Sequence, residues 1–125
     1  MGKPLNILSV DDEFCIAHAL AFALSNASRK LTLAFSADEA LAKVSEHSEP
    51  FDVVIVDHRM PQLSGIEFVQ RLRAMQFGGK ILVLSAHLND DNRRAYAELK
   101  VDTVLSKPFD VHELRDLVDS LAKVA

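Results

Sequence analysis

Cysteine and glycine are scarce in this chain of 125 residues. Cys15 is the only cysteine, so no disulfide can form within the chain. Neither Cys-x-x-Cys nor His-x-His spacing occurs, which removes the usual zinc sites. The glycines cannot form a Gly-x-Gly-x-x-Gly motif or a Walker phosphate loop; they are Gly2, Gly65, Gly78 and Gly79. Dinucleotide-binding and P-loop chemistry are therefore not expected.

Long apolar runs and an excess of basic charge are also missing. No stretch approaches the roughly 20 residues of a membrane span, and the first apolar run ends in acidic residues, unlike a signal peptide. With 18 acidic and 14 basic residues, the net charge of -4 argues against nucleic-acid binding. We expect a cytoplasmic location, no direct contact with membranes or nucleic acid, and one domain over residues 1–125.

Short apolar runs do occur, and they alternate with helical patterns. The runs are 5–10, 31–35, 51–56, 81–84 and 101–105, several of them apolar on both faces, as in buried parallel strands. Helix starts are marked by a capping residue three positions before an acid: Ser36 with Glu39, Ser64 with Glu67, and Asp110 with Glu113. Five such strand–helix units predict an α/β fold, the (βα)5 flavodoxin-like doubly wound parallel sheet with strand order 2-1-3-4-5.

Polar side chains stand at the ends of four of the five predicted strands. The first strand ends in two acids and the third in one; these are Asp11, Asp12 and Asp57. For a single acid, capping of the next helix is the ordinary explanation. Three carboxylates that meet at one sheet edge repel one another unless a cation joins them. Mg2+ prefers oxygen ligands, so the pattern indicates a magnesium site.

The fourth and fifth strands end in residues that suit a phosphoryl group. Ser85 offers a hydroxyl and Lys107 a positive charge. Phosphoryl transfer depends mainly on positioning and on charge stabilisation, which a metal ion and a lysine can supply together. An aspartate carboxylate can serve as the nucleophile and form an acyl phosphate.

Five motifs carry a resemblance to a known family: Asp11-Asp12-Glu13, Val56-Asp57-His58-Arg59-Met60-Pro61, Ser64-Gly65, Ser85-Ala86 and Lys107-Pro108-Phe109. Together they resemble the CheY-like receiver domain of the response regulators of two-component signal transduction. The resemblance covers essentially the whole chain. It implies a domain that takes phosphate from a histidine kinase or a histidine phosphotransfer protein in a Mg2+-dependent reaction. Such a domain also loses the phosphate by hydrolysis, but it is not a stand-alone enzyme.

The resemblance implies a role for each residue at the strand ends. Asp57 would be the phosphoacceptor, Ser85 the hydroxyl that moves to the phosphoryl group, and Lys107 its cationic partner. The ligands of the metal, Mg2+ or alternatively Mn2+, would be Asp11, Asp12, Asp57 and the backbone carbonyl of Arg59. The bond between Lys107 and Pro108 would be cis.

The chain departs from the family pattern at three places. Ser85 stands where many relatives have threonine, and its side chain turns more freely without the methyl group. Val104 stands where an aromatic residue is usual, so an aromatic switch at that position is not available. Lys100-Val101 replaces a common Gly-Ala pair, and we expect an altered turn before the fifth strand.

One predicted helix is a candidate for contact with the phosphate donor, and another is a candidate for movement on phosphorylation. Helix 14–24 would bury Ile16, Ala19, Leu20, Ala23 and Leu24. Its outward face would dock the phosphate donor through Phe14, His18 and Phe22, with a homodimer contact as the alternative. Segment 89–99 has few apolar anchors, mainly Tyr96 and Leu99, so we expect this helix to respond to phosphorylation. The five histidines lack metal spacing, and most of them are interpreted as surface residues; His58 directly follows Asp57.

Other functions of similar folds fit the residues less well. Aspartyl-phosphate phosphatases carry Asp-x-Asp after the first strand, whereas the candidate nucleophile here follows the third. A flavin-binding domain needs a phosphate cradle after the first strand, where acids would repel phosphate. A receiver-like adaptor that acts without phosphorylation stays open as the alternative, although the intact set of acids argues against it.

Overall fold

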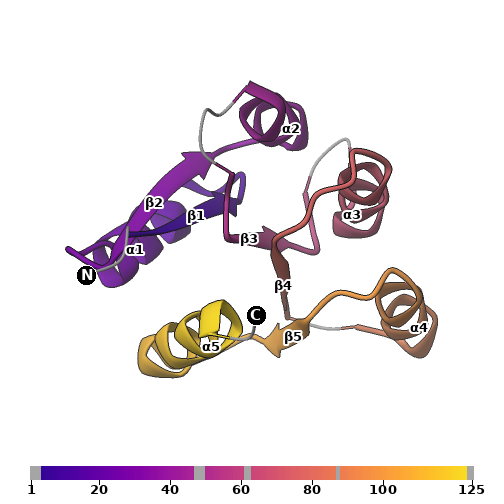
Figure 1. The fold of residues 1–125 in the computed structure, drawn as a ribbon. Coiled ribbons are helices and arrows are strands. Elements are labelled where there is room, and N and C mark those ends of the chain that lie inside the picture. The colour runs from indigo at the N-terminus through magenta and orange to yellow at the C-terminus, as the bar shows by residue number, and fades with distance from the viewer. Residues whose placement is uncertain (1–3, 47–49, 61–62, 87, 124–125) are drawn as a thin grey trace.

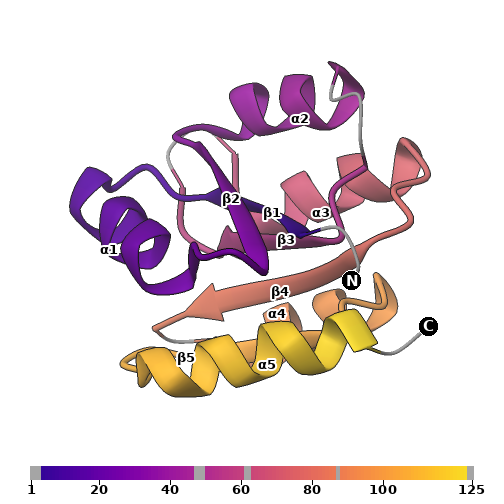
Figure 2. The ribbon, with the colours of Figure 1, turned by 60° about the vertical axis from the view of Figure 1, so that its left-hand side comes forward.

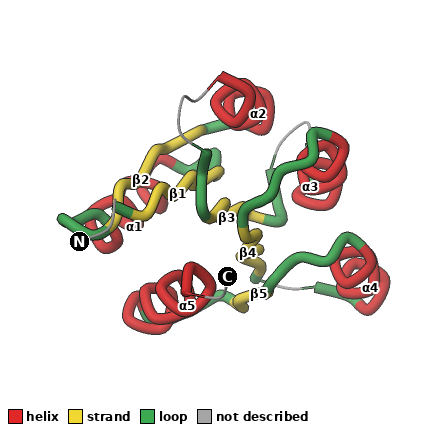
Figure 3. The backbone as a smooth tube through the Cα atoms, viewed as in Figure 1, coloured by secondary structure: helices red, strands yellow, loops and turns green. Residues whose placement is uncertain are grey.

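The computed structural model describes residues 4–46, 50–60, 63–86 and 88–123. Strands and helices alternate along the chain (Figure 1, Figure 3). The strands are β1 (Leu5–Val10), β2 (Arg29–Ala34), β3 (Val53–Asp57), β4 (Lys80–Ser85) and β5 (Thr103–Ser106). The helices are α1 (Phe14–Leu24), α2 (Ala37–Glu46), α3 (Gly65–Ala74), α4 (Asp90–Glu98) and α5 (Val111–Lys123).

All five strands run parallel in one sheet with the order β2-β1-β3-β4-β5. The predicted fold class and strand order are therefore confirmed. Helices α1 and α5 lie on one side of the sheet, and α2, α3 and α4 lie on the other (Figure 1, Figure 2). The order along the sheet reverses at β1, so β1 and β3 flank the point where ligands bind in such folds.

A separate hydrophobic core fills each side of the sheet. Along β3, Val53 and Ile55 belong to the core beneath α1 and α5, whereas Val54 and Val56 belong to the core beneath α2, α3 and α4. Side chains of a strand alternate between its two faces, so a strand that serves two cores is apolar at every position. This alternation explains the continuous apolar runs in the sequence.

Helix caps form at the predicted positions, with one difference. Ser36 accepts a hydrogen bond from the backbone N–H of Glu39 at 3.1 Å, and Ser64 accepts one from Glu67 at 3.2 Å. At α5, the Asp110 carboxylate accepts instead from the N–H of His112 at 2.7 Å. The carboxylate therefore satisfies a free N–H group of the first turn, one residue earlier than predicted.

The turn between α4 and β5 keeps a left-handed residue without a glycine. Lys100 has a φ of 60°. Its N–H donates to Ala97 at 3.1 Å, and the N–H of Val101 donates to the Tyr96 carbonyl at 3.2 Å. This is the Schellman ending of a helix. Val101 belongs to this helix ending and not to the strand, so β5 begins at Thr103, two residues later than predicted.

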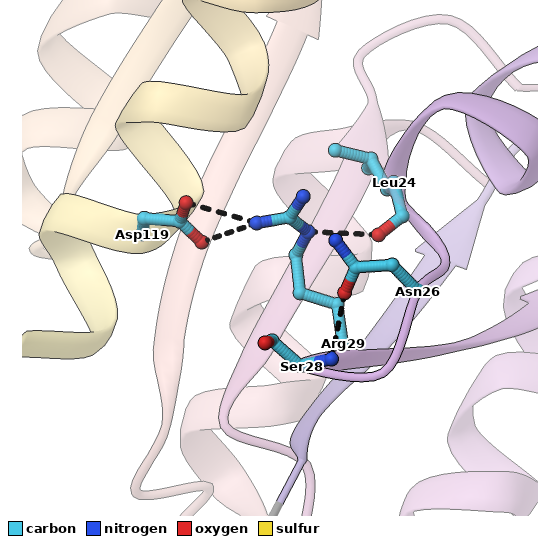
Figure 4. Close-up of polar contacts among 5 residues, drawn as sticks. All are labelled: Leu24, Asn26, Ser28, Arg29 and Asp119. Carbon is cyan, nitrogen blue, oxygen red and sulfur yellow. Dashed lines mark hydrogen bonds and ion pairs between the residues drawn. The ribbon is translucent and has the colours of Figure 1, made fainter.

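A buried arginine joins β2 to α5. The Nη1 atom of Arg29 contacts both oxygens of the Asp119 carboxylate, at 2.8 and 2.9 Å, and its Nε donates to the Leu24 carbonyl at 2.7 Å (Figure 4). Arg29 is 8% exposed, whereas the Asp119 side chain is 42% exposed. The pair fixes the start of β2, the end of α1 and the middle of α5 in one arrangement.

Candidate functional site

Asp57 is the last residue of β3, the central strand, and it lies at the carboxyl edge of the sheet. Its side chain is largely buried. One carboxylate oxygen, Oδ1, accepts a hydrogen bond from the N–H of Arg59 at 3.1 Å. The other, Oδ2, lies 3.0 Å from the Nζ atom of Lys107. Contacts from two different loops therefore hold this carboxylate in place.

Two further carboxylates reach the same point from the end of β1. One oxygen each of Asp11, Asp12 and Asp57 lie within 4.8 Å of one another, as the sequence predicted. Asp11 is only 1% exposed. Its Oδ1 atom accepts from the N–H of Glu13 at 2.9 Å, whereas its Oδ2 atom is buried and has no hydrogen-bond partner among the described residues. A buried, unpartnered carboxylate oxygen is what a hard cation would coordinate.

The charges of the cluster do not balance. Burial raises the pKa of Asp11, and the neighbouring negative charges of Asp57 and Asp12 raise it further. The hydrogen bond from Glu13 and the positive charge of Lys107 lower it in part. Three carboxylates face one lysine, so a divalent cation would relieve the repulsion. The residues present therefore fit the predicted magnesium site.

The ends of β4 and β5 complete this edge of the sheet. Ser85 is buried at the end of β4, and its carbonyl accepts from the N–H of Lys107 at 2.8 Å. The bond between Lys107 and Pro108 is cis, which confirms that prediction. Lys107 is half-buried. The backbone thus brings the lysine and the serine to the same edge as the three acids.

A hollow of about 440 Å³ opens beside the carboxylates. Residues from the loops after β1 and β3 line it: Asp12, Glu13, His58, Arg59, Met60 and Ser64. A larger hollow of about 690 Å³ is lined by the connections α2–β3 and α3–β4. Asp12 lines the smaller hollow, whereas none of the three clustered acids lines the larger one, so the smaller hollow is the one that adjoins the acidic cluster.

The sequence interpretation missed the surroundings of His58, which directly follows Asp57. His58 is half-buried, and its Nδ1 atom lies 2.6 Å from the Tyr96 hydroxyl of α4. The two rings meet edge to face, with centroids 5.5 Å apart. Burial lowers the pKa of His58 and raises that of Tyr96, so both are neutral at pH 7. The sequence held one signal of this contact. Tyr96 is an expected anchor of its helix, and the hydroxyl of a buried tyrosine usually has a hydrogen-bond partner.

The outward face of α1 is only partly described. Phe22 is 92% exposed, and His18 is exposed and stacks on Phe35 with centroids 6.2 Å apart. The side chain of Phe14 lies outside the described residues, as does that of Ile16. Leu20 and Leu24 are buried as predicted, but Ala19 is exposed, so its assignment to the core was wrong.

Comparison with known proteins connects this geometry to a family. The sequence pattern of the response regulator receiver domain matches residues 7–119. The chain belongs to this receiver domain family. The match begins within β1 and ends within α5, so it includes every strand end described above.

Curated relatives of the receiver domain are response regulators. The chain is 31% identical over 113 residues to the probable transcriptional regulatory protein TcrX of Mycobacterium tuberculosis, covering 90% of this chain and 47% of TcrX. It is 32% identical over 117 residues to the alkaline phosphatase synthesis transcriptional regulatory protein PhoP of Bacillus subtilis, covering 94% and 48%. The chain thus spans about half the length of the curated relatives it matches.

Solved structures share the fold over nearly their full length. The chemotaxis protein CheY4 of Vibrio cholerae superposes with a TM-score of 0.86 at 28% identity, covering 94% of this chain and 98% of that one. The receiver domain of the Francisella response regulator 1452 gives a TM-score of 0.85 at 29% identity, with coverage of 95% and 97%.

Family membership supplies the general chemistry of the site. Receiver domains bind Mg2+ at a cluster of aspartates, and this receiver domain has such a cluster in Asp11, Asp12 and Asp57. Response regulators take part in two-component signalling, so a histidine kinase is the kind of partner that the relatives imply. No helix in the described part of the chain is long and apolar enough to cross a membrane.

Proposed function

We propose that residues 1–125 act as one phosphoacceptor domain, which takes a phosphoryl group from a phosphohistidine onto Asp57 and signals through its surface. The observation that carries this proposal is the position of Asp57 within 4.8 Å of the oxygens of Asp11 and Asp12, with Lys107 at 3.0 Å. A carboxylate with these neighbours is held in place at the carboxyl edge of the sheet, beside two further acids and a lysine.

In the proposed reaction, an Asp57 carboxylate oxygen attacks the phosphorus of the donor phosphohistidine. A P–O bond forms as the P–N bond breaks, and the imidazole of the donor leaves with the electron pair. Lys107 neutralises charge on the phosphoryl oxygens, and the Ser85 hydroxyl donates a hydrogen bond to one of them. Water later hydrolyses the acyl phosphate, which returns Asp57 to its carboxylate form.

Three side chains and one carbonyl of this chain would hold the metal: Asp11, Asp12, Asp57 and the backbone oxygen of Arg59. When bound, Mg2+ supplies positive charge to the phosphoryl oxygens and offsets the repulsion among the acids. The unpartnered Oδ2 atom of Asp11 supports its part in this set. Mn2+, with similar oxygen preference, is the alternative ion.

The donor is a histidine kinase or a histidine phosphotransfer protein, which we propose docks on α1 through Phe14, His18 and Phe22. Helix α1 contains no Asp, Glu, Lys or Arg, and Phe22 projects into solvent. Phe22→Asp should slow transfer from the cognate donor by about tenfold or more. Met75→Asp, at an exposed apolar residue that follows α3, is the matched control and should leave the rate unchanged.

Modification with a small phosphate donor tests the function without a partner. Wild type incubated with Mg2+ and acetyl phosphate should gain the mass of one phosphoryl group, and Asp57→Asn should gain none. Asp91→Asn, at an exposed acid of α4, is the matched control and should behave as wild type. Failure of wild type to be modified, or Mg2+-independent modification at another residue, would favour the adaptor that acts without phosphorylation.

A further inference from the structure

Helix α4 is attached to the rest of the domain by one deeply buried side chain. Tyr96 is its only buried residue, and it joins the core beneath α2, α3 and α4. Its hydroxyl reaches through this core to the Nδ1 atom of His58, at 2.6 Å. A second residue of α4, Asn92, places its Nδ2 atom 3.4 Å from Nε2 of the same ring. A neutral imidazole has one donor and one acceptor nitrogen, so it can serve both partners at once.

His58 is itself fixed beside the phosphoacceptor. Its N–H donates to the Leu84 carbonyl of β4 at 2.9 Å, and its carbonyl accepts from the N–H of Gly65, the first residue of α3, at 2.9 Å. The peptide bond before it joins it directly to Asp57. A shift of the loop after Asp57 would therefore reach the imidazole ring through a backbone that is anchored on both sides.

The atoms around this contact are closely packed. A Cβ atom on Gly65 would collide with the Tyr96 hydroxyl oxygen, and it would lie 2.9 Å from the Cα atom of His58. Three elements thus meet at one point: the loop after β3, the start of α3 and the middle of α4. Packed interiors of this kind transmit displacements, because neighbours cannot yield without moving.

Other connections to α4 do not begin at the phosphoacceptor. Arg73 of α3 holds the far end of α4 through the carbonyls of Leu99 and Lys100, both at 2.8 Å. Val104 of β5, three residues before Lys107, has neither a ring nor a hydroxyl with which to reach α4. Among these connections, the contacts of His58 with Tyr96 and Asn92 start next to Asp57, and the one with Tyr96 is the shorter and more deeply buried of the two.

We propose that His58 and Tyr96 are positioning residues that couple modification of Asp57 to the position of α4, in place of an aromatic residue on β5. The inference rests on the proposed function. A phosphoryl group on Asp57 changes the charge and the backbone of the loop that holds His58. The ring moves with this loop, and Tyr96 carries α4 along through its hydroxyl.

Hydrogen exchange of the full chain, with and without Mg2+ and beryllofluoride, tests the coupling. In wild type, beryllofluoride should change the exchange of α4 amides. Tyr96→Phe keeps the ring and removes only the hydroxyl, so it should bind beryllofluoride yet lose most of this change. Loss of one hydrogen bond shifts an equilibrium between two helix positions by about fivefold. His58→Leu should behave in the same way, and His58→Asn, which restores a polar atom near Nδ1, should recover part of the response.

Arg73→Met provides the matched control, because it loosens α4 without touching His58. Its α4 amides should exchange faster in both states, with the beryllofluoride-induced difference retained. An α4 response in Tyr96→Phe equal to that of wild type, or an equal loss of response in Arg73→Met, would overturn the coupling. Absence of any Mg2+-dependent beryllofluoride binding by wild type would instead overturn the proposed function, so the two failures are distinguishable.

Discussion

Two buried groups of charged residues in this domain are built in opposite ways. At the start of β2, Arg29 contacts both oxygens of one carboxylate through Nη1 and a backbone carbonyl through Nε, so one negative charge balances its positive charge (Figure 4). At the carboxyl edge of the sheet, three acids share one lysine, and an oxygen of Asp11 has no partner among the described residues.

The difference separates a structural role from a binding role. A matched ion pair gains nothing from a further ligand, whereas an unmatched cluster leaves interaction energy available for a cation and a phosphoryl group. The first group fixes β2 against α5. The second concentrates negative charge at one edge of the sheet, and the proposed cation would relieve that repulsion.

The largest expected effect is stabilisation of wild type by Mg2+. At a concentration of 100 times the dissociation constant, one site stabilises the folded state by about 2.7 kcal/mol. Thermal unfolding with and without MgCl2 measures this shift, and CaCl2 tests selectivity. Asp57→Asn should respond much less. An unchanged melting temperature in wild type at high Mg2+ would contradict the metal site.

Breaking the matched pair should come next in size. Asp119→Ala leaves the Arg29 guanidinium buried with only the Leu24 carbonyl, and we expect a loss of about 2 kcal/mol, less than for a fully buried pair because Asp119 is half-exposed. Urea unfolding measures this loss, which Mg2+ should not change. Asp116→Ala, at an exposed acid one turn earlier on α5, is the control. Equal losses in both variants would show that the ion pair has no structural role.

Removing one acid from the unmatched cluster should have the opposite sign. In EDTA at neutral pH, Asp11→Asn should stabilise the domain by about 1 kcal/mol, because it removes a buried, repelled charge. The raised pKa of Asp11 means that its folded form binds a proton more readily than its unfolded form. Its stabilising contribution is therefore present at acidic pH and lost as pH rises through the raised pKa.

The advantage of Asp11→Asn over wild type should accordingly grow from acidic to neutral pH, and unfolding curves across that range measure it. In Mg2+ the order should reverse, with metal affinity reduced by about tenfold or more. A variant that is less stable than wild type in EDTA at every pH would show that Asp11 is matched after all.

Salt should produce the smallest difference. Raising NaCl without Mg2+ screens repulsion among the three carboxylates and should stabilise wild type by a few tenths of a kcal/mol. Asp11→Asn should gain less from the same salt. The difference in melting temperature between the two, measured at low and high NaCl, checks this. A salt response of equal size in both would assign it to other surface charges.

Much of the fold and of the site could be predicted because both depend on local rules. Strands that serve two cores must be apolar on both faces, and the residues that follow parallel strands must share an edge. The acids at 11, 12 and 57 are therefore brought together by topology alone. The caps of α2 and α3 depend on residues three positions apart, so they are visible in the sequence as well.

What could not be predicted depends on packing between distant residues or on weak patterns. His58 and Tyr96 are 38 positions apart, and their hydrogen bond follows from how α4 lies on the core. The assignment of Ala19 to the core was wrong because α1 has no charged residues, so its sequence does not show which face of the helix turns toward the sheet. A glycine at position 100 would have predicted a left-handed residue. Lysine adopts this conformation at a cost of about 1 kcal/mol, so its sequence gives no such signal.

The placement of α1 and α4 on opposite sides of the sheet has a consequence for how two partners bind the domain (Figure 1). A donor seated on α1 and a target seated on α4 would not compete for the same surface. The domain would then receive a signal and deliver it while both neighbours are bound, with the parallel sheet between them. Phosphoryl transfer from the donor and recognition by the target would then take place in one complex, so the acyl phosphate need not outlast that complex.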